Sequence, residues 1–192
     1  MNIRGMTLSL LIVCAALLPA RADDVTDQIN EAMTAYSRKD LPTAIAGLEA
    51  ALNLMRQSRA DTYGALLPAA PAGWTADDVE TISVGVAMAG GGTGASREYH
   101  KGDTTVKVSI LADSPLLQVI STFASSGIAA MSGMRTQIVN GRRTIYMKDD
   151  GAFTTIVGDR ILVRVEGKGL PEDVLKQFLT AVDFAAVEKA GK

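Results

Sequence analysis

Cysteine is nearly absent from this chain of 192 residues, which contains a single one, Cys14. Cys14 lies in an N-terminal segment that we expect to be removed. The remaining chain would then have no disulfide, no thiol nucleophile and no thiolate metal site. Histidine is equally scarce, and the chain has only His100. A hydrolytic triad usually needs a histidine base, and no G-x-S-x-G nucleophile motif accompanies this one.

The first 22 residues have the three parts of a secretory signal peptide. A charged start is followed by an apolar run at residues 8–18 and by the cleavage site Ala20-Arg21-Ala22. The run is shorter than the roughly 20 residues that span a bilayer. A lipoprotein signal would need a small residue before Cys14, where the chain has a valine. We therefore expect a periplasmic or secreted protein that begins at Asp23.

No charge of one sign dominates the expected mature chain. The whole sequence has 19 basic and 21 acidic side chains, and the leader removes two arginines and no acid, which leaves 17 against 21. This small negative balance argues against nucleic acid and anionic membranes as partners. The length that remains suffices for one domain with its own core.

Residues 23–65 are predicted to form a helical hairpin. Apolar residues recur every three or four positions in two runs, so each run lies on one helical face. The runs are Val25, Ile29, Met33 and Tyr36, then Leu41, Ile45, Leu48, Leu52 and Met55. With Ala44-Ile45, Leu48 and Ala51-Leu52, the second run resembles the second helix of a tetratricopeptide repeat. Because such repeats need neighbours and no second copy follows, the resemblance implies a hairpin that docks on the rest of the chain.

Residues 66–78 are predicted to be a linker, because two prolines and a glycine follow the hairpin closely. From residue 79 to the end the pattern indicates an α+β domain. Period-two alternation predicts strands at 79–88, 97–101 and 104–112, with a glycine-rich loop at 89–96.

Two helices are also predicted in this domain. A capping residue followed by a proline indicates a helix from 113 towards 131. Pro171 and two acidic residues indicate a last helix. Its apolar stripe consists of Val174, Leu175, Phe178, Leu179 and Val182.

Three turn signals separate four β-prone segments near the C-terminus: Asn140-Gly141, Asp150-Gly151 and Gly158-Asp159. Taken as two-residue loops, they pair residue 138 with 143, 147 with 154, 145 with 156, and 156 with 161. This register predicts a four-stranded antiparallel meander with one packed face. That face would hold Ile138, Ile145, Met147, Ile156, Ile161, Val163 and Val165.

The element order of residues 80–190 resembles the PsbP-like and DcrB-like fold of exported accessory proteins. The shared feature is an antiparallel sheet with helices packed on it. The resemblance implies a non-enzymatic protein with an assembly or accessory role in the envelope, since members of this fold bind partners instead of catalysing reactions.

The opposite face of the predicted meander carries cations and rings and no acid: Arg142, Tyr146, Lys148, Phe153, Arg160, Leu162 and Arg164. Aromatic and arginine side chains anchor many recognition surfaces. We therefore predict that this face binds an envelope protein or another anionic partner surface. The alternative is that the helical hairpin folds over this face and buries it.

The glycine run at residues 90–94 lacks the Lys-Ser/Thr of a phosphate loop and precedes a strand, so a phosphate site is not indicated. Gly91 and Gly92 could instead offer their backbone to a partner. Together with Arg97 and Tyr99 on the next strand, they form a second predicted contact region.

Two other functions stay open. Carboxylates such as those at Asp149-Asp150 and Asp77-Asp78 could converge in space and form a small hydrolase. Met131 and Met134 could bind Cu(I) through thioether ligands, although core packing explains methionines equally well. The sequence assigns no catalytic residue, cofactor or metal ligand, and its first prediction is a partner-binding protein.

Overall fold

The computed structural model describes residues 21–82, 92–114, 117 and 134–192. The chain divides into two compact units, Met1–Ala51 and Leu52–Lys192, called here the hairpin unit and the sheet unit. The division falls within helix α2 (Leu41–Gly64) and not in the segment 66–78. The second half of α2 therefore belongs to the sheet unit.

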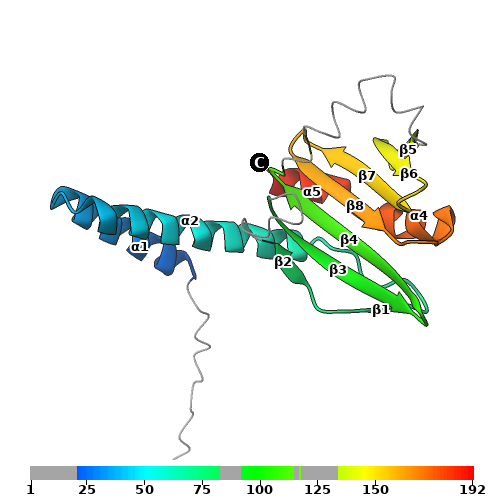
Figure 1. The fold of residues 1–192 in the computed structure, drawn as a ribbon, viewed down its shortest axis with the longest axis horizontal. Helices are drawn as coiled ribbons and strands as arrows, with labels where there is room; N and C mark the ends of the chain where they lie inside the picture. Colours follow the sequence, from blue (N-terminus) through cyan, green and yellow to red (C-terminus); the bar gives the residue numbers. More distant parts are fainter. Residues whose placement is uncertain (1–20, 83–91, 115–116, 118–133) are drawn as a thin grey trace, which may run out of the picture. The chain divides into compact units, whose positions relative to one another are not determined.

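Helix α1 (Arg21–Ser37) and the first half of α2 form the hairpin unit (Figure 1). Lys39 has a positive φ of 64° in the turn between them, and the carboxylate of Asp40 accepts a hydrogen bond from the Thr43 backbone amide at 3.3 Å. Small residues bring the helices together, because a Cβ added to Gly47 would lie 3.0 Å from the Cβ of Ala32.

Alanines, and not the large apolar residues, fill the contact between these helices. Ala32, Ala35, Ala44 and Ala51 are all buried. The predicted helical runs are present, but their large side chains lie outside this contact. The exposed members are Met33, Tyr36, Leu41, Ile45, Leu48, Leu52 and Met55.

The sheet unit is built on eight antiparallel strands. They are β1 (Thr75–Ala76), β2 (Glu80–Ile82), β3 (Thr93–Lys101), β4 (Thr104–Ala112), β5 (Met134–Val139), β6 (Arg142–Met147), β7 (Ala152–Val157) and β8 (Ile161–Glu166). The order is β1-β3-β4-β8-β7-β6-β5, and β2 also pairs with β3. The predicted α+β class and the meander β5–β8 are thus confirmed (Figure 1).

The register of the meander differs from the prediction at two of its three turns. Asn140-Gly141 is a two-residue loop, and Ile138 pairs with Arg143 as expected. The next loop has four residues, so that Ile145 pairs with Thr154. The last loop has three residues, 158–160, and Ile156 pairs with Leu162. The predicted pairs 147–154, 145–156 and 156–161 are therefore wrong.

The two errors have different consequences because side chains alternate between faces along a strand. A shift of two residues keeps every side chain on its expected face, whereas a shift of one exchanges the faces. The predicted packed set is divided as a result. Ile161, Val163 and Val165 lie on one face, and Ile138, Ile145, Met147 and Ile156 lie on the other.

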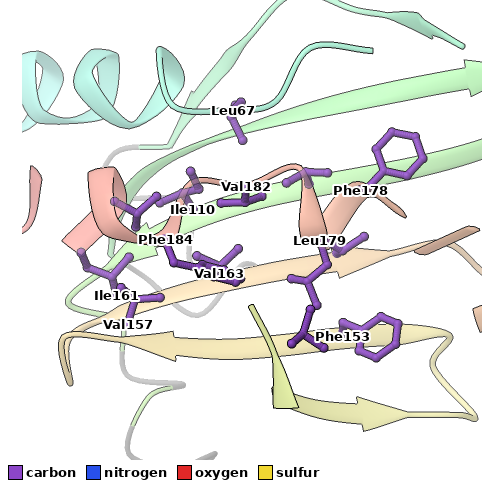
Figure 2. Close-up of a cluster of buried hydrophobic side chains, with 14 of the residues drawn as sticks. Leu67, Ile110, Phe153, Val157, Ile161, Val163, Phe178, Leu179, Val182 and Phe184 are labelled. Atoms are coloured by element: carbon purple, nitrogen blue, oxygen red, sulfur yellow. The ribbon is translucent and has the colours of Figure 1, made fainter. Parts of the chain in front are cut away.

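The face that holds Val163, called the core face, is covered by two helices, α4 (Glu172–Thr180) and α5 (Phe184–Ala190). In Figure 2, Leu179, Val182 and Phe184 lie among side chains of β4, β7 and β8, and Phe178 belongs to the same buried cluster. Tyr63 from α2 and Leu67 after it belong to the same buried cluster. A segment before the expected domain start thus supplies part of the core.

Several local predictions can be compared with these elements. The strand at 104–112 is confirmed, with Val106, Val108 and Ile110 fully buried. Strand β3 begins at Thr93, so part of the expected glycine-rich loop is strand. The last helix is confirmed as α4, whereas α5 was not predicted. The helix expected between 113 and 131 falls almost entirely outside the described residues.

Asp113 connects three parts of the sheet unit. Its carboxylate accepts hydrogen bonds from Arg59 of α2 at 2.7 Å and from Arg160 of the last meander loop at 2.7 Å. Burial alone would raise the pKa of Asp113, but the bonds from Arg160 and Arg59 outweigh it and hold that pKa below the ordinary value. The ionised form is therefore favoured in the folded state.

We expect Asp113→Asn to destabilise the protein at neutral pH by up to about 1 kcal/mol, since the carboxylate is partly exposed and screened. A lowered folded-state pKa stabilises the fold above the unfolded pKa, and this contribution disappears as pH falls through the folded value. Urea unfolding at pH 7 and pH 3 measures the difference. The gap between variant and parent should be smaller at pH 3 than at pH 7. An equal gap at both values would contradict the assignment. Asparagine tolerates the positive φ of 56° at this position, so backbone strain is matched.

Candidate functional site

The aromatic rings of the predicted binding face are buried. Tyr146 and Phe153 pair across β6 and β7 on the core face, with ring centroids 4.6 Å apart. Phe153 is fully buried and Tyr146 is 5% exposed. The expectation of exposed rings is wrong, because α4 and α5 cover the face on which they lie.

The cations of that face are separated by the same change of register. Arg142 lies on the core face and forms an ion pair with Glu188 of α5, a contact that lowers the pKa of Glu188. Arg164 lies on the opposite sheet face, called the second face, and pairs with Glu166 at 2.9 Å. Lys148 is exposed in the loop after β6. The structure thus does not gather these residues into one surface.

The second predicted contact region is also largely internal. Gly91 lies outside the described residues, and Gly92 is buried with a φ of 110°. A Cβ at Gly92 would lie 2.7 Å from the carbonyl oxygen of Ala112, which gives the glycine a packing role. Tyr99 is fully buried, and its hydroxyl donates to the Pro68 carbonyl at 2.6 Å. Burial raises the pKa of Tyr99, although the half-buried Arg97 beside it acts in the opposite direction.

The second face changes in character along its strands. At one end Leu111, Leu117 and Leu162 form a small apolar cluster. A row of hydroxyl groups and one cation follows across four strands: Ser96, Ser109, Arg164 and Thr154. The next row holds Glu98, Lys107 and Glu166. Alternation shows which charges share a face within one strand. To assign the charges of β3, β4 and β8 to the same face, the register of β8 must also be correct.

A polar cleft of about 550 Å³ opens beside these charged residues. Its carboxylates are Glu98, Asp149, Asp150 and Glu166. A cleft with several carboxylates is the feature that the hydrolase hypothesis requires. However, Glu166 is paired with Arg164 at 2.9 Å and Glu98 with Lys107 at 3.4 Å. Half of these acids are therefore engaged by cations of the same cleft.

The residues proposed for copper are only partly described. Met134 is half-buried at the start of β5, and Met131 lies outside the described residues.

Another group of possible metal ligands consists of Asp77, Glu98 and His100. One ligand atom from each of these residues lies within 4.8 Å of the others.

The clearest exposed apolar surface lies on the hairpin unit. We call it the apolar stripe: Met33, Tyr36, Leu41, Ile45 and Leu48. All five side chains are more than half exposed, and none carries a charge. The sequence pattern identifies the same residues, and the docking of the hairpin on the rest of the chain stays a prediction.

No protein-family model matches this chain, and the comparisons with curated proteins and with solved structures find no match either. The resemblance to the PsbP-like and DcrB-like fold therefore stays a prediction. Within the described ranges, no helix has both the length and the apolar character needed to cross a membrane.

Proposed function

We propose that this protein is an exported, non-catalytic accessory protein that binds a partner protein through the apolar stripe of its hairpin unit. The observation that carries the proposal is the exposure of five large apolar side chains on one compact unit, among them Tyr36 at 68% and Ile45 at 55%. Contiguous exposed apolar surface marks interaction sites in soluble proteins.

The packing of the hairpin explains why this stripe is free for a partner. Alanines and Gly47 bring α1 and α2 close together, so the hairpin is held by small side chains. The large residues are not needed for that contact. Two adjacent helices with uncharged apolar residues fit an apolar helix of another protein, which binds through residues spaced by three and four. Such a helix is the partner we infer.

We expect the double substitution Ile45→Gln and Leu48→Gln to abolish partner binding and to leave the free energy of unfolding within about 0.5 kcal/mol, the usual range for exposed sites. Both side chains are exposed on α2, and glutamine is a good helix former. A photo-reactive phenylalanine analogue at Leu48, followed by mass spectrometry of the cross-linked peptide, identifies the partner helix. Binding of that peptide by parent and variant is then measured by fluorescence anisotropy.

Ala46→Gln and Asn53→Gln are the matched control, because both positions are exposed on the same helix and lie outside the apolar stripe. This control should bind like the parent. Cross-links to a second copy of the chain, or unchanged binding by the Ile45 and Leu48 variant, would contradict the proposal.

A small hydrolase is the second candidate, and the cleft with four carboxylates is the observation that favours it. The ion pairs of Glu98 and Glu166 favour the binding protein instead, because a general acid or base must be able to exchange its proton. A hydrolytic activity lost on Glu166→Gln and kept on Ile45→Gln would reverse this order.

A further inference from the structure

His100 lies beside two carboxylates on the second face of the sheet. Glu98 and His100 are two positions apart on β3, so their side chains point to the same face. Asp77 follows β1, and its backbone amide donates to the Glu98 carbonyl at 3.0 Å. Two neighbouring strands therefore fix all three residues relative to one another.

The ligand atoms of this group converge. One atom each from Asp77, Glu98 and His100 lies within 4.8 Å of the others, and the His100 Nε2 is 2.9 Å from the Asp77 Oδ2. The His100 Nδ1 lies 3.1 Å from the hydroxyl oxygen of Thr105, its partner on β4. A hydrogen bond from the second ring nitrogen to a neighbouring oxygen is how metal-binding histidines are oriented, with the other nitrogen left as the ligand.

We propose that Asp77, Glu98 and His100 form a binding site for a divalent transition-metal cation of the Zn²⁺ class. One imidazole and two carboxylates suit Zn²⁺ and its neighbours better than Ca²⁺ or Mg²⁺, which prefer ligand sets made entirely of oxygen. All three side chains are partly exposed, so the cation reaches them from solvent. The site is independent of the apolar stripe.

Lys107 sets the affinity of this site. Its ammonium group lies 3.4 Å from Glu98 and 3.7 Å from Glu80, so it competes with a cation for the Glu98 carboxylate. The two carboxylates and Lys107 together keep a net negative charge, which attracts a divalent cation. Lys107 can retain Glu80 when Glu98 turns to the metal.

Titration of the untagged mature chain with Zn²⁺ in a calorimeter tests the proposal, and the visible spectrum of added Co²⁺ reports the ligand geometry. We expect one ion per chain. Asp77→Asn and His100→Gln should each lower the association constant by at least about 10-fold. Loss of a residue that only supports a metal ligand already costs about that much. Lys107→Gln should raise it, because a competing positive charge is removed.

Asp103→Asn, at an exposed acid in the turn between β3 and β4, is the control and should bind as the parent does. Circular dichroism verifies the fold of each variant. An Asp77→Asn variant that is folded and binds Zn²⁺ as tightly as the parent would overturn the proposal, as would a parent chain that binds no ion.

Discussion

Phe178→Ala should lower the free energy of unfolding by about 3–5 kcal/mol, the usual cost of removing a buried aromatic side chain. Phe178 is fully buried, and its ring lies 5.0 Å from Trp74 and 4.9 Å from Tyr99 between ring centroids. Removing it leaves a cavity between α4 and β3 and disrupts both ring contacts, each worth about 0.5–1.5 kcal/mol. Urea unfolding followed by tryptophan fluorescence measures the loss, since the only tryptophan, Trp74, packs edge-on against this ring.

Ile138→Ala is the control for this prediction. Ile138 is 66% exposed, although the sequence placed it in the packed face. Its replacement should change the stability by no more than about 0.5 kcal/mol. A similar loss in both variants would mean that α4 does not cover the core face as described.

The second large effect concerns where the chain can be shortened. A chain that begins at Leu52 keeps Ala60, Tyr63 and Leu67, all buried in the sheet unit, and should unfold cooperatively near the temperature of the parent. A chain that begins at Trp74 loses all three residues. Large buried side chains contribute about 2–5 kcal/mol each, against a total of about 5–15 kcal/mol for a domain. This shorter chain should show no cooperative transition.

Differential scanning calorimetry of both shortened chains and the parent measures this difference. The outcome that would contradict it is a chain from Trp74 that melts as sharply as the chain from Leu52. In that case Tyr63 and Leu67 would be peripheral, and the unit would begin after α2.

Sequence patterns predicted most elements of this fold, because periodicity and caps act over a few residues. Strand β4 and helix α4 are examples, with alternation in the one and Pro171 before the other. Helix α5 also had a local signal, since the Asp183 carboxylate accepts hydrogen bonds from the amides of Ala185 and Ala186.

The facing of β8 could not be obtained in the same way. The pair Gly158-Asp159 fits a two-residue loop, and both residues adopt the positive φ that such a loop requires. Arg160 nevertheless joins them in a three-residue connection. Arg160 also donates a hydrogen bond to Asp113, a residue far away in the chain, and such tertiary contacts cannot be read from local turn signals. That single residue moved Tyr146 and Phe153 from a predicted surface into the core.

The proposed cation site was hidden for a related reason. Alternation along β3 places Glu98 and His100 on one face, and this much follows from the sequence. Asp77 joins them only through the pairing of β1 with β3. Two-residue strands such as β1 have no periodicity to detect, so the third ligand becomes visible only in the structure.

The loop at 158–160 also limits which insertions and deletions this chain can tolerate during evolution. Losing or gaining one residue there would move Ile161, Val163 and Val165 to the second face and bring Leu162 and Arg164 onto the core face. A change of two residues in the preceding loop, 148–151, leaves every facing intact. We therefore expect one-residue insertions and deletions at 158–160 to be tolerated much less often during evolution than two-residue changes at 148–151.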